Sequence, residues 1–235
     1  MIQAGSNKVA SPWSLHGVAV IPDPSAALFL PAEKALIVAD LHFEKGSAYA
    51  QHGQMLPPYD TGETLKRLAQ AIQRYQPECV IALGDSFHDL RADGRMAERD
   101  AETLTSLVQS MPDWVWIEGN HDPVPPPRFG GRVLPSLQLG PLTLRHEPRN
   151  GQVRGEIAGH LHPCAKVRGK GRSVRARCFA TDGARMVMPA FGAFTGGLNV
   201  CDPAFSQIFL ARPDAWIIGT QDIYAVSSRR LAPQS

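Results

Sequence analysis

Residues 35–42 read Ala-Leu-Ile-Val-Ala-Asp-Leu-His, an apolar run that ends in an aspartate and, two positions later, a histidine. The same arrangement recurs at residues 79–88, Cys-Val-Ile-Ala-Leu-Gly-Asp-Ser-Phe-His, and at residues 114–121, Trp-Val-Trp-Ile-Glu-Gly-Asn-His. Runs that are apolar on both faces are typical of central strands covered by helices. We therefore expect three buried strands, each followed by polar residues at its carboxyl end.

Helical patterns separate these runs. Asp60 and Glu63 match a capping box at the start of a helix, and a second helix is expected from about Asp93 to Ser110. A further strand at residues 27–30 precedes the first run. The alternation of strands and helices predicts a parallel sheet with helices packed outside it.

The second half of the chain has a different pattern, with short strands and few helical segments. We expect strands at residues 142–146, 156–159, 164–168, 174–180, 186–188 and 206–210. They complete a two-sheet α/β sandwich. Residues 1–14 lack periodicity and are expected to form a loose lead-in to a single domain, residues 15–235.

The composition is that of a globular protein, with 43% hydrophobic and 20% charged residues. No apolar run approaches the roughly 20 residues of a membrane helix, and residues 1–13 contain no apolar segment of a secretory signal. The four cysteines are scattered, which favours free thiols in a reducing cytosol over disulfides or a thiolate zinc site. A net charge of +2 is too small to indicate nucleic-acid binding by itself.

Five short blocks share one composition, Asp, Asn and His residues beside apolar runs, and contain six of the eight histidines. They are residues 39–42, 84–89, 119–122, 145–148 and 159–162. Taken singly, each block has the ordinary alternative of a solvated cap at a strand end. All five together favour a metal centre, because they offer enough oxygen and imidazole ligands for two ions. Two adjacent cations are a device for hydrolysing phosphate esters.

The ligands divide between two ions by spacing. Side chains at i and i+2 of a strand point the same way, so Asp40 and His42 can both reach one metal, and His160 and His162 repeat this geometry. The two oxygens of Asp85 can bridge both ions, and Gly84 beside it permits a close approach. We expect one ion on Asp40, His42, Asp85 and His162, and the other on Asp85, Asn120, His146 and His160. Manganese is our first expectation, with iron, zinc or magnesium as alternatives and copper disfavoured.

The order and spacing of these motifs, D-x-H, G-D, G-N-H-[DE], a lone His and G-H-x-H, closely resemble the calcineurin-like metallophosphoesterase superfamily. The resemblance spans Asp40 to His162. It implies a four-layered α/β sandwich with two mixed sheets flanked by helices, and it agrees with the ligand sets above. It also implies a bridging hydroxide as nucleophile and His121 as the residue that meets the leaving oxygen.

The segment after Asp85 narrows the substrate class. It lacks the G-D-x-x-D-R-G of protein phosphatases in this superfamily. His88, three residues after Asp85, is instead similar to G-D-x-F-H in repair nucleases of the SbcD type, where this histidine supports phosphodiester cleavage. The alternative is that His88 fixes the position of His121, as partners of metal-site residues often do.

Residues 39–47, 55–60 and 189–199 look like the ligase-associated DNA damage response endonucleases, the PdeM family. That resemblance implies a nuclease or phosphodiesterase encoded beside an ATP-dependent DNA ligase and a helicase. His52 and Tyr59 lie in the loop within this region and could reach substrate, although surface residues of a loop are the default. Residues 191–197 are expected to make a tight turn near the site, with no role in chemistry.

A basic segment at residues 166–177 supports nucleic-acid binding independently, because it holds six basic residues and no acidic one. Its glycines at 169 and 171 predict a hairpin tip, and Arg168, Arg175 and Arg177 are expected to hold a phosphate backbone. The alternative is a solubilising surface hairpin.

The leading function is therefore a metal-dependent phosphodiesterase acting on DNA. The alternatives are a phosphodiesterase for a small nucleotide or lipid-linked pyrophosphate, and a metal-loaded, catalytically silent scaffold for repair partners. A scaffold would have no need for a histidine at the leaving-group position.

Overall fold

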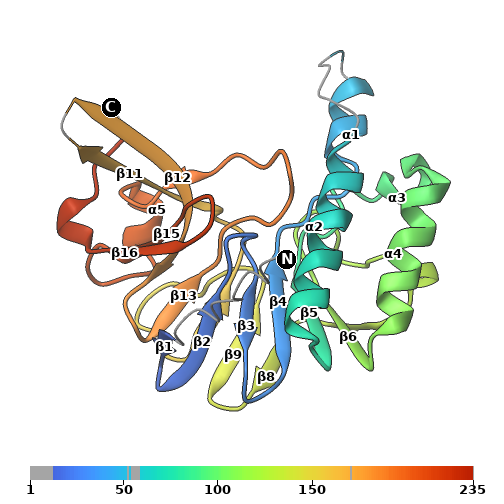
Figure 1. Ribbon diagram of the computed structural model, residues 1–235, viewed down its shortest axis with the longest axis horizontal. Helices are drawn as coiled ribbons and strands as arrows, with labels where there is room; N and C mark the ends of the chain where they lie inside the picture. The colour runs from blue at the N-terminus through green and yellow to red at the C-terminus, as the bar shows by residue number, and fades with distance from the viewer. Residues whose placement is uncertain (1–12, 52, 54–58, 170, 235) are drawn as a thin grey trace, which may run out of the picture.

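The computed structural model describes residues 13–51, 53, 59–169 and 171–234, and shows two β-sheets packed face to face with most of the helices against one of them (Figure 1). Residues 1–12 of the expected lead-in lie outside the described residues. Trp13 and Ser14 already belong to a strand, so ordered structure begins earlier than the sequence pattern indicated.

The first sheet has seven strands in chain order. They are β1 (Trp13–Leu15), β2 (Val18–Pro22), β3 (Leu28–Leu30), β4 (Ala35–Ala39), β5 (Cys79–Leu83), β6 (Asp113–Ile117) and β7 (Arg132–Leu134). Strands β4 to β7 are parallel, and β1 to β4 pair antiparallel. The three central strands predicted from the apolar runs are therefore confirmed as β4, β5 and β6.

Four helices lie against this sheet: α1 (Lys45–Gln51), α2 (Asp60–Tyr75), α3 (Ala92–Arg95) and α4 (Glu98–Ser110). A 3-10 turn, η1 (Pro127–Phe129), packs beside α4. The predicted helix from Asp93 to Ser110 is wrong in one respect, because it is interrupted at Met96, whose φ of −63° and ψ of 129° are extended. Helix α1 was not predicted.

The predicted capping box at Asp60 is also wrong. Tyr59 is the N-cap and makes no capping hydrogen bond with its side chain, while Asp60 lies in the first turn of α2. The Asp60 Oδ2 instead accepts a hydrogen bond from the Gly46 backbone nitrogen at 2.7 Å. The Asp60 carboxylate therefore makes a tertiary contact with α1 instead of capping α2.

The second sheet has nine strands, with parallel and antiparallel pairs. They are β8 (Leu137–Leu139), β9 (Leu142–Arg145), β10 (Glu156–Ala158), β11 (Pro163–Gly169), β12 (Arg172–Thr181), β13 (Arg185–Val187), β14 (Leu198–Asn199), β15 (Asp214–Ile218) and β16 (Ile223–Val226). Another 3-10 turn, η2 (Ser228–Arg230), follows β16.

The strand predicted at residues 206–210 is wrong. Residues of this region form α5 (Pro203–Ser206) and the turn after it. Asp202 is the N-cap, with its Oδ1 3.0 Å from the Ala204 backbone nitrogen, and Pro203 follows at the first helical position. An Asp-Pro pair is a helix-start signal, and it prevails here over the apolar residues that suggested a strand.

The core has layers, as strand β4 illustrates. Leu36 and Val38 pack with α2 and α4, whereas Ile37 packs between the two sheets with Ile157 of β10. A third cluster covers the outer face of the second sheet and includes Phe205 of α5. The order helices, sheet, sheet, α5 with its loops confirms the α/β sandwich of two mixed sheets. None of the helices in the described residues is long and apolar enough to cross a membrane.

The carboxyl ends of the central strands meet at one edge. Ala39 is paired with Leu83, Leu83 with Ile117, and, in the other sheet, Arg145 with Ala158. The polar blocks follow directly after these residues. The fold therefore brings together segments that are far apart in the chain, as in the hydrogen bond from the His160 backbone nitrogen to Asp40, 120 residues away.

Candidate metal centre

The backbone turns sharply where the polar blocks leave the strands. Asp40, His42, Asp85, His160 and His162 have φ of 54°, 47°, 46°, 70° and 46°, respectively. Residues other than glycine are uncommon in this left-handed region, and such strain clusters at functional sites. The conformation could not be predicted from the sequence.

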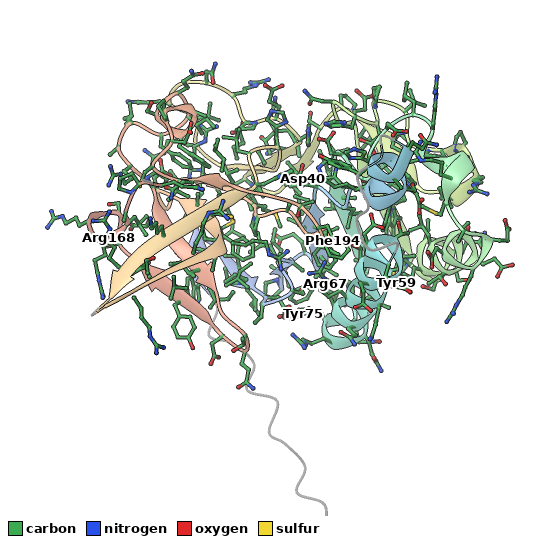
Figure 2. The ribbon with its side chains drawn as sticks, turned by 90° about the horizontal axis from the view of Figure 1, so that it is seen from above. Asp40, Tyr59, Arg67, Tyr75, Arg168 and Phe194 are labelled. Atoms are coloured by element: carbon green, nitrogen blue, oxygen red, sulfur yellow. The ribbon has the colours of Figure 1, made fainter. Side chains whose placement is uncertain are left out.

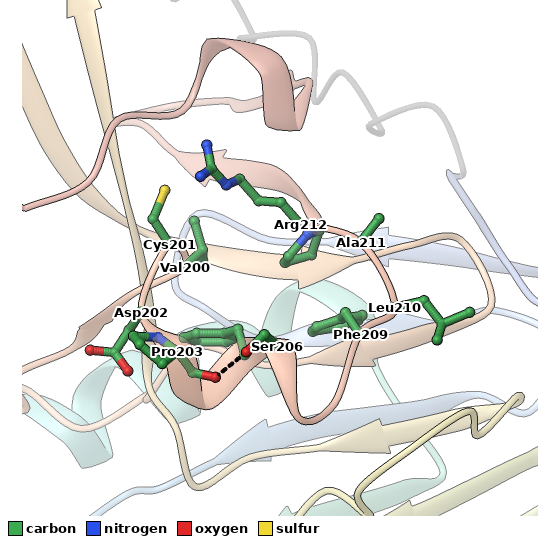
Figure 3. Close-up of a pocket in the computed structure, with 11 residues that line it drawn as sticks. Val200, Cys201, Asp202, Pro203, Ser206, Phe209, Leu210, Ala211 and Arg212 are labelled. Atoms are coloured by element: carbon green, nitrogen blue, oxygen red, sulfur yellow. Dashed lines mark hydrogen bonds between the residues drawn. The ribbon is translucent and has the colours of Figure 1, made fainter.

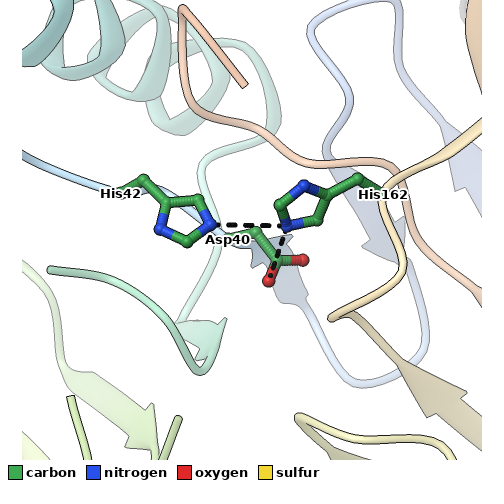
Figure 4. A group of neighbouring side chains, drawn as sticks. All are labelled: Asp40, His42 and His162. Atoms are coloured by element: carbon green, nitrogen blue, oxygen red, sulfur yellow. Dashed lines mark hydrogen bonds and ion pairs between the residues drawn. The ribbon is translucent and has the colours of Figure 1, made fainter. Parts of the chain in front are cut away.

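One group of converging side chains consists of Asp40, His42 and His162, whose ligand atoms lie within 4.8 Å of one another. His162 Nε2 is 3.2 Å from Asp40 Oδ1 and 3.4 Å from His42 Nε2 (Figure 4). Asp40 is fully buried. Two imidazole nitrogens and a buried carboxylate oxygen that face the same point form a donor set that fits a divalent cation.

A second group consists of Asp85, His146 and His160. His146 Nε2 lies 3.3 Å from Asp85 Oδ2 and 3.2 Å from His160 Nδ1. The His146 Nδ1 is 2.9 Å from the Leu83 carbonyl oxygen, to which it donates. This hydrogen bond leaves the lone pair of Nε2 in the neutral ring directed at the other two residues, as expected of a metal-binding histidine.

The two groups adjoin each other. The Asp40 carboxylate accepts from the His160 backbone nitrogen at 3.0 Å and lies 3.8 Å from His146 Nδ1. The Asp85 side chain belongs to the second group, and its charge also acts on His42 of the first. The arrangement therefore fits a pair of neighbouring cations.

The surroundings favour the neutral form of His42 and the ionised form of Asp85, whereas without a bound metal the carboxylates of Asp40 and Asp85 favour the protonated form of His146. Burial lowers the pKa of His42 to about 3, although the charge of Asp40 opposes this shift. Burial raises the pKa of Asp85, but the hydrogen bond and charge of His146 outweigh it and hold that pKa well below its usual range. Burial likewise lowers the pKa of His146, but the hydrogen bond with Asp85 and the charges of Asp40 and Asp85 raise it to about 9.

Asn120 differs from the other expected ligands. It is exposed, and within the described residues its side chain makes no hydrogen bond. The neighbouring His121 is tied in through its backbone nitrogen, which donates to Asp85 Oδ1 at 2.9 Å, while its Nε2 lies 4.0 Å from Asp85 Oδ2. The structure thus brings His121 to the second group and leaves Asn120 at the surface beside it.

His88 lies next to His121. Their rings stack with centroids 5.5 Å apart and an interplanar angle of 16°, and the His42 ring lies 5.7 Å from that of His88. Burial, together with the charge of Lys45, lowers the pKa of His88. The His88 ring is therefore placed against a side chain of the site rather than at a solvated helix start.

Sequence reasoning missed two residues of this region. Asp122 is buried, and its Oδ2 accepts hydrogen bonds from two backbone nitrogens of the segment that carries Asp85. Lys45 is half-buried, and its charge lowers the pKa of both His42 and His88. Asp122 is the last residue of the G-N-H-[DE] motif, and Lys45 belongs to residues 39–47, which resemble the PdeM family. The sequence therefore contained a signal for both residues, but neither was given a role.

The predicted basic hairpin is present as β11 and β12, with Arg168 paired to Ser173, and Arg168 is exposed. Arg175 and Arg177 share a face, but both are engaged with a loop: Arg175 Nη2 donates to the Gly197 carbonyl and Arg177 Nη1 to the Ala190 carbonyl at 2.9 Å. Lys170 lies outside the described residues. Of the weaker candidates, Tyr59 is 70% exposed, and His52 and residues 55–58 lie outside the described residues.

A pocket of about 310 Å³ lies elsewhere, between the end of β14 and the start of β15 (Figure 3). It is lined by Val200, Cys201, Asp202, Pro203, Phe205, Ser206, Phe209, Leu210, Ala211, Arg212 and Pro213. It contains no histidine and no member of either metal-binding group. The chemistry-bearing residues therefore lie at the edge of the sheets and not in this pocket.

No family model matches the chain, and the comparison with curated proteins found no match. Among solved structures, the chain is similar to a Pseudomonas putida nuclease MPE, with 29% sequence identity, a TM-score of 0.70 and coverage of 92% of this chain and 99% of that chain. It is also similar to Yfce, a phosphoesterase from E. coli, with 12% identity, a TM-score of 0.40 and coverage of 83% and 98%. The first likeness, over nearly the whole of both chains, agrees with the predicted fold.

Proposed function

We propose that this chain, a metallophosphoesterase by its fold and its two adjoining metal-binding groups, hydrolyses phosphodiester bonds in DNA. The observation that carries the proposal is the convergence of Asp40, His42 and His162 beside Asp85, His146 and His160 at one edge of the sheets. The similarity to a nuclease supports nucleic acid as the substrate. A role in repair, beside a DNA ligase and a helicase, extends the proposal through the resemblance to the PdeM family.

The residues proposed to hold the cations are those expected from the sequence. One ion would bind Asp40, His42, Asp85 and His162, and the other Asp85, Asn120, His146 and His160. The oxygen and imidazole donors suit manganese, our first choice, as well as iron, zinc or magnesium. A bound pair of such cations supplies Lewis-acid activation of the phosphoryl group and of the attacking water.

His121 and His88 act on the leaving group in this proposal. His121 would hold a proton at Nε2 and give it to the leaving oxygen, which is supported by its exposure and its place 4.0 Å from Asp85. His88 would orient the His121 ring by stacking on it. This arrangement supports positioning by His88 over direct proton transfer.

The basic hairpin would bind the phosphate backbone through Arg168, Arg175 and Arg177. The basic surface is larger than the sequence indicated, because residues near the carboxyl end of the chain pack beside the hairpin. The Ala232 backbone nitrogen donates to the Lys166 carbonyl at 2.8 Å, which places exposed Arg229 and Arg230 of η2 beside the hairpin. A basic surface assembled from two segments supports contact with several phosphates.

Two further expectations belong to the proposal. Residues 15–235 would form one domain, which is supported by the core cluster that both sheets share. The enzyme would act in the cytoplasm, which is supported by four cysteines that are all free.

The test is hydrolysis by protein loaded with manganese, measured on DNA oligonucleotides, bis-p-nitrophenyl phosphate and p-nitrophenyl phosphate. We expect cleavage of DNA and of the small diester, with the monoester slower. Asp85→Asn should abolish it, whereas Asp93→Asn, which removes a carboxylate paired with Arg128 at the surface, should not. Activity on the small diester alone would favour a small-molecule phosphodiesterase, and no activity with full metal content would favour a scaffold.

A further inference from the structure

Two arginines from distant parts of the chain meet at one loop. Arg67 of α2 donates from Nη2 to the Phe191 carbonyl oxygen at 2.5 Å, and Arg177 of β12 donates from Nη1 to the adjacent Ala190 carbonyl at 2.9 Å. The Arg67 guanidinium also lies 5.0 Å from the centre of the Phe191 ring. Two cationic side chains are therefore fixed on neighbouring peptide groups.

Neither guanidinium has a carboxylate partner within the part of the chain that the structure describes. Glu63, one turn earlier on α2, acts on Arg67 only at longer range. Burial, and then the charge of Arg177, lower the pKa of Arg67 to about 10, and burial lowers the pKa of Arg177. Two half-buried like charges destabilise each other, and a bound anion would offset that cost.

The loop that carries these arginines adjoins the metal-binding groups. The Phe191 backbone nitrogen donates to the Ala39 carbonyl at 2.7 Å, and the Gly192 nitrogen donates to the Asp40 carbonyl at 3.1 Å. Figure 2 shows Asp40, Phe194 and Arg67 in the same central part of the molecule, well apart from Arg168 at the outer end of the β-rich half. The two guanidinium groups are thus hydrogen-bonded to the loop whose backbone is itself hydrogen-bonded to Ala39 and Asp40.

We propose that Arg67 and Arg177 together form a subsite for the phosphate next to the scissile one in the substrate strand. This inference rests on the proposed function. Each guanidinium carries five N–H donors, and only one of them is used here by a loop carbonyl. The remaining donors can bind the non-bridging oxygens of a phosphate in the forked geometry that arginine favours.

The subsite has a consequence for specificity. A substrate with a second phosphate gains charge-assisted hydrogen bonds that an ester with one phosphate cannot make. Arg67 and Arg177 would then select a chain of nucleotides over a single small ester, and would do so close to the cations rather than at the exposed tip of the hairpin.

The experiment uses p-nitrophenyl esters that share one scissile bond. Thymidine 5′-phosphate p-nitrophenyl ester is compared with the same ester bearing a second phosphate on the 3′ oxygen as a methyl diester, and the pair with the two positions exchanged is measured as well. The metal-loaded wild-type protein should prefer one two-phosphate ester by about tenfold or more in kcat/KM, the size expected for one or two charge-assisted hydrogen bonds.

In Arg67→Gln and Arg177→Gln this ratio should fall to about one, whatever happens to the rate on the single-phosphate ester. Arg67→Lys, which keeps the charge without the fork, should give an intermediate ratio and guards against a misfolded glutamine variant. Thr64→Val is the matched control. It removes the hydrogen bond of 3.1 Å from the Ala193 nitrogen to Thr64, another tie to the same loop, without changing a charge, and it should keep the wild-type ratio.

Three other results would each contradict a different part of this inference. Glutamine variants that slow both esters equally, with the ratio intact, would mean that the arginines only hold the loop. A wild-type ratio near one would mean that there is no such subsite, although the proposed function would stand. Failure of the wild-type protein to hydrolyse any of the esters would overturn the proposed function and this inference together.

Discussion

The buried carboxylate of Asp122 accepts a hydrogen bond from the backbone nitrogen of Ser86 at 2.8 Å. The same oxygen accepts a second one from the Phe87 nitrogen at 3.0 Å. Asp122 therefore ties the loop after β6, which carries His121, to the loop after β5, which carries Asp85. These two hydrogen bonds go to backbone nitrogens and not to ligand side chains, and they fix the distance between the loops that present the ligands.

Asp122→Ala should weaken both the fold and the site. It would leave two buried N–H groups without an acceptor, at a cost of about 1–3 kcal/mol for each. Asp122→Asn should be milder, because its amide oxygen can still accept and because burial, with the charge of Asp85 adding to it, raises the pKa of Asp122 to about 7. Thermal unfolding and metal content measure the difference. Equal destabilisation by both substitutions would argue against the role of the oxygen as acceptor.

The site could be predicted from the sequence to the extent that its residues follow strand ends. Asp40 and His146 come directly after β4 and β9, Asp85 follows β5 with Gly84 between them, and parallel pairing brings such positions to one edge. The left-handed backbone at Asp40 and Asp85, and the hydrogen bond from His146 to Leu83, depend on contacts between strands and could not be predicted.

Gly119→Ala should remove activity by a steric route. A methyl group there would lie 2.1 Å from the Asp85 backbone nitrogen and 2.5 Å from Asp85 Oδ1, so the segment that carries Asp85 would have to move. Misplacement of a catalytic group by about 1 Å can cost about 100-fold in rate. Rate and metal content are compared with Gly94→Ala in α3, where a methyl group meets nothing within 4 Å. Similar behaviour of the two variants would exclude the steric argument.

The ionisation of Asp23 makes the free energy of unfolding depend on pH. Its Oδ2 accepts from Arg74 Nη1 at 2.6 Å and from the Tyr75 hydroxyl at 2.8 Å, which ties the end of α2 to the turn between β2 and β3. Burial raises the pKa of Asp23, but hydrogen bonds from Ser25 and Tyr75 and the charge of Arg74 outweigh it, so the pKa lies below its ordinary value.

A lowered pKa in the folded state means that the ionised form stabilises the fold above the unfolded value, about 3.9. The stabilisation is lost as the pH falls through the lower folded value. The free energy of unfolding of the wild-type protein should exceed that of Asp23→Asn by about 1.5–3 kcal/mol at pH 7, the range for hydrogen bonds to a charged group. The gap should close below about pH 4 in denaturant titrations at several pH values. A gap that is constant down to about pH 2 would contradict this account.

The errors of the sequence analysis share one cause. The capping box at Asp60, the unbroken helix through Met96 and the strand at residues 206–210 were all read from local patterns. At Asp60 a contact with the Gly46 nitrogen prevails, and at residues 206–210 the Asp202-Pro203 start of α5 prevails. The break at Met96 follows from its extended backbone, which no residue of the apolar pattern indicates. The buried strands were predicted well, because a run of apolar residues is a stronger signal for a buried strand than one or two polar residues are for a helix end.

His121→Ala should lower the rate while the metals stay bound. Help from a general acid is typically worth about 10²–10⁴-fold. The loss should be small for a nitrophenyl diester, whose leaving group needs little protonation, and large for a methyl or nucleoside leaving group. Rates on a series of diesters with graded leaving groups measure this. An equal loss across the series would indicate that His121 positions the phosphate instead.

The surface formed by Arg168, Arg229 and Arg230 should determine the salt dependence of DNA binding. Arg229→Gln with Arg230→Gln removes two exposed charges beside the hairpin without disturbing the hydrogen bonds of Arg175 and Arg177 to the loop. Each phosphate that the variant no longer neutralises should reduce the slope of log K against log salt by about 0.7–0.9. The matched control is Arg91→Gln with Arg99→Gln, two exposed arginines on the helical side of the molecule.

Binding is measured by fluorescence anisotropy of a labelled oligonucleotide at several salt concentrations, with metal content checked for each variant. Only the pair at 229 and 230 should flatten the slope, because only that pair adjoins the hairpin through the hydrogen bond between Ala232 and Lys166. Adding Arg168→Gln should flatten it further, since Arg168 is exposed on the same hairpin. If the control pair has the same effect, the dependence reflects net charge alone, and the basic surface has no special place in binding.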